Sequence, residues 1–189
     1  MFEDSLCGQF LIAGKQLRDS NFYKTVVLIV EHGVQGTMGL VLNRPSSVTI
    51  AHALSEHFNL PETDDLVFVG GPVEPSALFI LHNAGHLDEE KTPVSSGLYL
   101  GSSAEVFETV VRSACEKDAG LKFRIFSGCA GWSPGQLEGE LERGDWHLLS
   151  ASTENLFLED CYELWDILLQ KLGESNRILP ESHGNPEWN

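Results

Sequence analysis

Basic residues are scarce in this sequence. Its 189 residues include 12 lysines and arginines against 28 aspartates and glutamates, which gives a formal net charge of −16. Such an excess of negative charge repels phosphate backbones, and no cluster of lysine and arginine reverses the field locally. The composition therefore argues against nucleic acid as a direct partner.

Long apolar runs are also missing, and cysteine is sparse. No apolar stretch approaches the roughly 20 residues that a membrane span needs. The first residues, MFEDSLCGQFLIAG, carry acids where a secretory signal carries basic residues. The four cysteines are widely spaced and form no CxxC pair. We therefore expect reduced thiols, a cytoplasmic location and no membrane partner.

Strand and helix patterns are interspersed along the rest of the chain. Residues 24–31 and 37–44 are β-branched runs joined by HGVQG, which predicts a hairpin. Further strands are expected in LVFVGGP, ALFILHN, LYLG, LKFRIFSGC and WHLLSA. Helices are expected over 47–58, from a capping box at Ser102, and over 161–173. Because this order is not a strict strand–helix alternation, we predict a mixed-sheet α+β fold. Residues 1–173 form the expected single domain, followed by a polar tail at 174–189.

The segment SGCAGWSPGQLEGELERGDW, residues 127–146, reads as a strand that turns into a short helix and back. Ser133 is the expected N-cap, with Gln136 completing a capping box. Trp132 and Leu137 occupy the two positions of a hydrophobic staple, and Gly144 provides the left-handed exit. The remainder, GCAGW, matches neither a P-loop nor a dinucleotide fingerprint. Close strand–helix packing is the simpler interpretation, and an anion site at the turn is the alternative.

Three motifs in series carry a resemblance to a known family. FYKTVVLIVEHGVQGTMGLVLNRP, VFVGGPVEPSALFILH and SGCAGWSPGQLEGELERGDW together resemble the YqgE/AlgH family of bacterial proteins, from about Gly8 to about Gly173. The resemblance implies a cytoplasmic protein with a bifurcated sheet that is partly closed as a barrel and surrounded by helices. It implies no established biochemical activity. The sequence departs from the family pattern at Cys129, where an aromatic residue is common, and in its extra acidic tail.

Six residues near the glycine-rich turns are candidates for a shared binding region. They are His32, Asn43, Gly71, His82, Trp132 and Gln136. Turns at the ends of strands can present side chains and free backbone donors to a ligand. The alternative is that Gln136 and Trp132 serve the helix cap and that His82 only ends a strand. His82 and His86 have the i, i+4 spacing of a zinc pair, but Gly85 argues against a helix there, so we expect no metal and no cofactor.

Two classes of function are compatible with these features. We favour a non-enzymatic binding or regulatory protein that acts through an unknown protein or small-molecule partner. An enzyme of unrecognised type, with a site near the Gly-rich turns, is the alternative. A role as a transcriptional regulator, the label that the family often carries, is disfavoured by the net charge and by the lack of a basic recognition helix.

Overall fold

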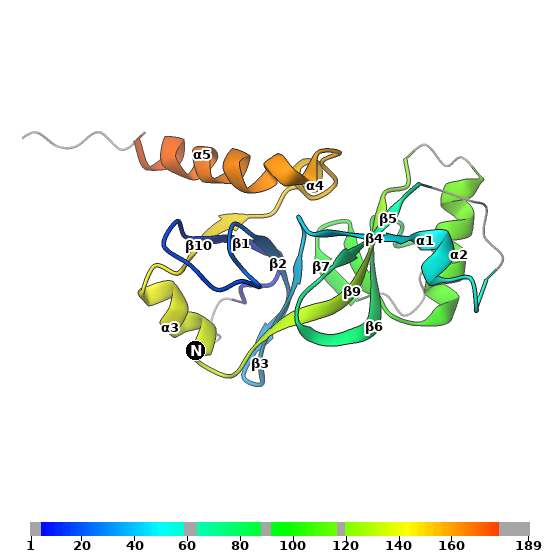
Figure 1. The fold of residues 1–189 in the computed structure, drawn as a ribbon, viewed down its shortest axis with the longest axis horizontal. Helices are drawn as coiled ribbons and strands as arrows, with labels where there is room; N and C mark the ends of the chain where they lie inside the picture. The colour runs from blue at the N-terminus through cyan, green and yellow to red at the C-terminus, as the bar shows by residue number, and fades with distance from the viewer. Residues whose placement is uncertain (1–4, 59–63, 88–91, 117–119, 178–189) are drawn as a thin grey trace, which may run out of the picture.

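The computed structural model describes residues 5–58, 64–87, 92–116 and 120–177 (Figure 1). Its strands are β1 (Gln9–Ala13), β2 (Val26–Gly33), β3 (Gly36–Val41), β4 (Pro45–Thr49), β5 (Leu66–Val69), β6 (Val73–His82), β7 (Thr92–Ser95), β8 (Leu98–Gly101), β9 (Phe123–Trp132) and β10 (Trp146–Ser150). Its helices are α1 (Ile50–Ala53), α2 (Ala104–Cys115), α3 (Gln136–Glu142), α4 (Thr153–Leu156), the 3-10 turn η1 (Cys161–Glu163) and α5 (Leu164–Arg177).

The long strand β9 joins two halves of one sheet. The strands follow the order β10-β1-β2-β3-β9-β6-β8-β7, and β4 and β5 branch off this path. At its end β9 pairs with β3, where Trp132 lies opposite Thr37, whereas earlier it pairs in parallel with β5, where Phe126 lies opposite Phe68. Two strands thus share one edge of β9, and the sheet forks there. Because β5 is parallel to β9 and the other pairs are antiparallel, the sheet is mixed, as predicted.

The fork requires two backbones to pass at very short range. A Cβ atom on Gly71 would lie 2.2 Å from the carbonyl carbon of Cys129, and one on Gly70 would lie 2.2 Å from the Gly128 oxygen. No side chain fits at either position. The Gly-Gly pair after β5 is therefore explained by the crossing of the chain.

The sheet curls until its far edge approaches its beginning. The thiol of Cys7, just before β1, has two carbonyl oxygens within hydrogen-bonding distance, those of Val30 in β2 at 3.0 Å and of Val94 in β7 at 3.5 Å. A Cβ on Gly8 would lie 2.8 Å from the Val94 oxygen. The curled sheet is a half-barrel with helices around it, so the chain is a single α+β domain. This confirms the predicted fold class.

Each half of the sheet has its own hydrophobic core. The larger core lies among β1, β2, β3 and β10 and includes Leu164 and Leu168 of α5. The smaller core lies between β5, β6, β9 and the two helices α1 and α2, with Val110 of α2 and Ile125 of β9 fully buried. In Figure 1, α5 covers one end of the molecule and α2 lies at the other.

The expected helix at 47–58 is wrong for most of its length. Residues 45–49 form β4, in which Pro45 and Thr49 pair with Phe68 and Leu66, and α1 covers only Ile50–Ala53. Thr49, not Ser47, accepts the capping hydrogen bond, from the backbone N–H of His52 at 3.3 Å. Pairing with β5, which is distant in sequence, outweighs the local helical pattern.

Other boundaries also differ from the sequence-based expectation. The strands β1 and β7 were not predicted. Ser103 caps α2, by accepting from the N–H of Val106 at 3.4 Å, where Ser102 was expected. The last helix, α5, continues past Gly173 to Arg177. The rest of the expected tail, 178–189, lies outside the described residues.

Candidate functional site

The six candidate residues do not gather in one place. His32 lies opposite Thr37, which lies opposite Trp132 at the end of β9, whereas His82 lies opposite Phe123 at the start of β9. These two positions are the opposite ends of the ten-residue strand β9, so they are separated along the strand by a chain length of up to ~30 Å. The expectation of one shared region is therefore wrong.

Trp132 and Gln136 are both engaged by the side chain of Glu140 in α3. The indole N–H groups of Trp132 and Trp146 each donate to Glu140 Oε2 at 2.9 Å, and the Gln136 amide donates to Oε1 at 2.9 Å. Burial opposes ionisation of this carboxylate, but the three donors, aided by Arg143, leave the pKa of Glu140 below its usual value. Trp132 is only 5% exposed, so its hydrogen bond fixes α3 on the sheet.

Half of the expected capping box is present at α3. Gln136 Oε1 accepts from the backbone N–H of Ser133 at 3.1 Å, as in a capping box. The N-cap is Gly135, with a φ of 75° and no side-chain cap, so the expected capping by the Ser133 hydroxyl is wrong. The left-handed Gly135 starts the helix two residues later than expected.

His32 joins β2 to α3. Its Nδ1 accepts from the backbone N–H of Leu6 at 3.2 Å, so its Nε2 carries the proton and donates to Glu138 Oε1 at 3.1 Å. The N–H of Glu138 itself and this contact with His32 lower the pKa of the Glu138 carboxyl. His32 thus lies in the same region as Trp132 and Gln136, where its two hydrogen bonds hold the N-terminal segment and α3 against β2.

Asn43 and Gly71 have structural roles at other places in the sheet. The Asn43 amide oxygen accepts from the N–H of Val26 at 3.0 Å, and its nitrogen donates to the Lys24 carbonyl at 2.9 Å. This pair of bonds holds the segment that enters β2. Gly71 lies at the fork of the sheet, where it touches Cys129.

His82 is fully buried at the end of β6, and its ring lies 5.9 Å from that of Tyr99 in β8. A ligand in solution has no access to it. Among the residues that the structure describes, no group of three His, Cys, Asp or Glu side chains could hold a metal ion.

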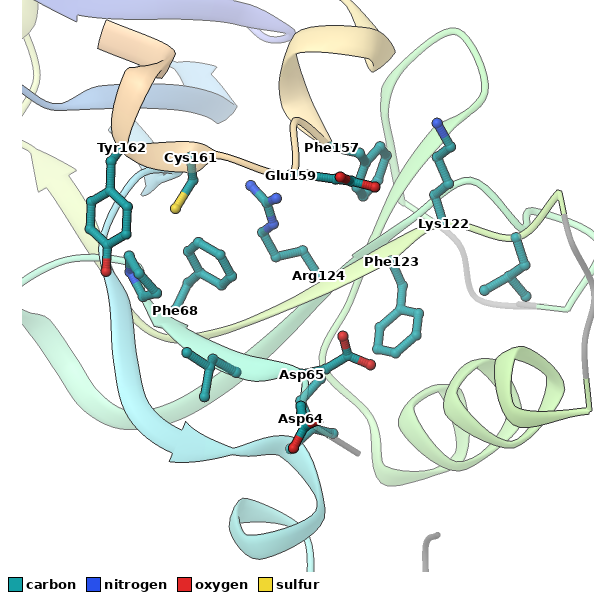
Figure 2. A pocket seen from close by; sticks show the side chains of 14 residues that line it. Asp64, Asp65, Phe68, Lys122, Phe123, Arg124, Phe157, Glu159, Cys161 and Tyr162 are labelled. Carbon is teal, nitrogen blue, oxygen red and sulfur yellow. The ribbon is translucent and has the colours of Figure 1, made fainter. Parts of the chain in front are cut away.

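A cavity of about 610 Å³ lies elsewhere, between β4, β5, the start of β9 and the segment that links α4 to η1 (Figure 2). Its size is within the ordinary range for small-molecule sites. Aromatic rings form much of its wall, from Phe68, Phe123, Phe157 and Tyr162. None of the six candidate residues lines it.

Arg124 is a half-buried cation in the wall of this cavity. Alternation along β9 turns Ile125 toward the core beneath α2 and Arg124 toward the opposite face. The guanidinium lies 4.3 Å from the centre of the Phe68 ring and donates to the carbonyls of Leu42 and Leu158, at 3.3 and 3.1 Å. Figure 2 shows it beside Phe68, with Asp64 at the opposite end of the cavity.

In the part of the chain that the structure describes, the Arg124 guanidinium has no carboxylate partner. Among the described residues, neither a hydrogen bond nor a salt bridge joins it to an Asp or Glu side chain. Burial lowers its pKa, and two of its five N–H groups are used by main-chain oxygens. A partly desolvated cation usually has an anionic partner. The remaining N–H groups of Arg124 have no acceptor among the described residues and can donate to a ligand.

Cys161 is the thiol of the cavity wall, at 5% exposure. Burial raises its pKa, and the nearby charge of Arg124 offsets this only in part. The thiol is therefore protonated at neutral pH. The other charged groups that line the cavity, Asp64, Asp65, Lys122 and Glu159, are all exposed and lie at its rim.

Residues 10–177 match the family model described as AlgH-like. The chain belongs to the AlgH-like family. A UPF0301 protein from Chlorobaculum tepidum is 33% identical over 188 residues and covers 100% of this chain and 98% of its own length. A UPF0301 protein from Rhizobium meliloti is 34% identical over 191 residues, covering 95% of this chain and 92% of its own.

Two solved structures share this AlgH-like fold. The solution structure of the AlgH protein from Pseudomonas aeruginosa has a TM-score of 0.73 and 31% identity, and covers 97% of this chain and 98% of its own. The crystal structure of protein DIP2367 from Corynebacterium diphtheriae has a TM-score of 0.71 at 23% identity, covering 90% and 94%, which is a likeness of fold alone. In the described part of this AlgH-like chain, no helix is both long and apolar enough to cross a membrane.

Sequence reasoning did not identify the cavity. The available signal was one arginine inside the apolar strand LKFRIFSGC, where an uncompensated charge is unusual. The wall that faces Arg124 comes from residues 157–162, whose position against β9 no local pattern indicates. The glycine-rich turns, which have clear local patterns, mostly serve the backbone crossings and helix caps of the AlgH-like fold.

Proposed function

We propose that this AlgH-like chain is a non-enzymatic binding protein of the cytoplasm, and that it holds a small-molecule ligand in the cavity of Figure 2. The observation that carries the proposal is Arg124, a half-buried cation that faces aromatic walls and has no carboxylate partner among the described residues. Structural cations are normally paired, whereas ligand sites present a few fixed polar groups in an apolar setting.

The chemistry of the cavity supports binding without catalysis. Its thiol, Cys161, is kept protonated by burial, which makes it a poor nucleophile. No histidine is among the described residues that line the cavity, so none of them offers an imidazole as a general base, and the carboxylates of the lining are exposed at the rim. These groups favour recognition of a ligand over its chemical conversion.

Mass spectrometry of the protein purified from its native host tests this proposal. Leu66, half-buried in β5, lines the cavity, so Leu66→Trp fills part of it with an indole ring. We expect small molecules released from the wild-type chain by denaturation to be absent from Leu66→Trp. Val34→Trp is the matched control, because Val34 is 85% exposed in the turn after β2.

Both variants are compared by thermal unfolding, so that a general loss of fold is recognised. If the wild type and Leu66→Trp release the same molecules, or the wild type releases none, the cavity is not a ligand site. If a second protein co-purifies equally with the wild type and with Leu66→Trp, this would favour a protein partner that binds at another surface.

A further inference from the structure

The chemical class of the ligand follows from how charge is arranged in the cavity. Among the described residues, the inner wall has one cation, the Arg124 guanidinium, beside the Phe68 ring. The rim has three exposed carboxylates, on Asp64, Asp65 and Glu159, and one exposed lysine, Lys122. A ligand therefore meets carboxylates at the entrance of the cavity and the partly desolvated guanidinium of Arg124 inside it.

This arrangement selects against highly charged anions. The chain has a net charge of −16, and three of the four charges on described rim residues are negative, so a polyphosphate would be repelled both at long range and at the entrance. A single anionic group that passes the rim reaches a guanidinium with free N–H donors. Charge-assisted bonds to a guanidinium are stronger when water is excluded.

The aromatic walls of the cavity indicate the chemistry of the part of the ligand that lies beyond its anionic group. Phe123 and Phe157 line the cavity beyond Arg124, and both are half-buried, so ring surface is available to a bound group. A planar apolar body can stack on such rings, while its anionic end reaches the cation. The volume of about 610 Å³ accommodates a small aromatic acid but not a macromolecule.

We infer that the cavity binds a monoanionic carboxylate with an aromatic or apolar body, and that Arg124 is the anchor for its carboxylate. This inference rests on the proposed ligand-binding function and adds the class of ligand and the residue that recognises it.

Three matched probes test the inference on the full chain. They are 3-phenylpropionate, its neutral amide and 3-phenylpropylamine, titrated while backbone and side-chain resonances of the cavity are followed by NMR. We expect the carboxylate to bind at least about tenfold more tightly than the amide, since a hydrogen bond to a charged group is worth that much. The amine should be weakest, because it would oppose the guanidinium charge.

Variants then assign the anchor. Arg124→Gln should weaken binding of 3-phenylpropionate by about tenfold or more, because the charged donor is lost. Lys122→Gln removes the same formal charge from the rim and should change binding by less than about twofold, as for exposed charges. Asp65→Asn leaves the contacts of Arg124 with Leu42 and Leu158 intact, and should tighten binding by about twofold by removing a rim carboxylate.

The outcomes separate the two proposals. Equal binding of acid and amide, or an equal loss in Lys122→Gln and Arg124→Gln, would overturn the carboxylate inference while the cavity still binds ligands. A cavity that responds to no probe would reject both. If Arg124→Gln does not fold, the ranking of the three probes and the effect of Asp65→Asn still decide the inference.

Discussion

Glu140 receives hydrogen bonds from side chains of three elements: Trp132 of β9, Trp146 of β10 and Gln136 of its own helix. In the sequence it is one of several acids in EGELERGD, where a solvated surface is the obvious interpretation. The two indole rings are 5% and 3% exposed, so their N–H groups depend on this carboxylate. One residue thus connects α3 to both strands beside it.

We expect Glu140→Gln to lower the free energy of unfolding by about 1–3 kcal/mol, the cost of leaving a buried donor without its acceptor. The amide nitrogen that replaces one oxygen would face either two indole N–H groups or the Gln136 amide. Chemical denaturation at pH 7 measures this. The control is Glu142→Gln, an exposed position of the same helix, which should be close to wild type.

The same substitution has a defined pH dependence. The pKa of Glu140 in the folded state is below its ordinary value of 4.5, so the stabilisation is fully present above that value. It is lost as the pH falls through the lower, folded-state pKa. The stability difference between wild type and Glu140→Gln should therefore be constant near neutrality and shrink below pH 4.5. A difference that grows on acidification would contradict this account.

At the scale of the element, the C-terminus of α3 is capped by backbone hydrogen bonds, whereas its N-cap, Gly135, has no side-chain hydrogen bond. Gly144 has a φ of 76°, and the N–H groups of Gly144 and Asp145 donate to the carbonyls of Leu141 and Glu140, both at 3.0 Å. These two bonds form a Schellman motif, which ends the helix and directs the chain into β10. The predicted exit at Gly144 is confirmed.

Gly144→Ala should cost about 1 kcal/mol or slightly more, since a left-handed conformation is unfavourable for a residue with a Cβ. The added atom meets nothing closer than 3.6 Å, so the cost is one of backbone conformation and not of crowding. Gly33→Ala is the control, because Gly33 is free of neighbours and has no left-handed φ, and it should be nearly neutral. Thermal or urea unfolding compares the two, and equal stability would show that Gly144 tolerates a side chain.

Elements with their own local signal were predictable, and those that depend on distant partners were not. The hairpin of β2 and β3 follows from two β-branched runs around a glycine turn, and α5 from leucines at helical spacing. In contrast, Ile50, Leu54 and Phe58 have helical spacing, but the preceding residues pair with β5. The cavity depends on a contact between Arg124 and Leu158, 34 residues apart, which no local pattern contains.

At the scale of the whole molecule, charge decides which partners are accessible. With a net charge of −16, the chain lacks the counterion-release contribution that supplies most of the affinity for duplex DNA. We expect no specific binding to duplex DNA at micromolar protein in physiological salt, as measured by fluorescence anisotropy. Saturable binding that depends on the DNA sequence would contradict this and revive a direct role in transcription.

The fork at β9 has a consequence for the order in which the molecule can be built. The partners of β9 on both halves of the sheet, β3, β5 and β6, precede it in the chain. During synthesis from the N-terminus, these strands leave the ribosome with an unpaired edge until residues 123–132 emerge. Exposed edges of this kind can pair with other chains. The nascent protein therefore depends on one late segment, β9, to join the two halves of its sheet.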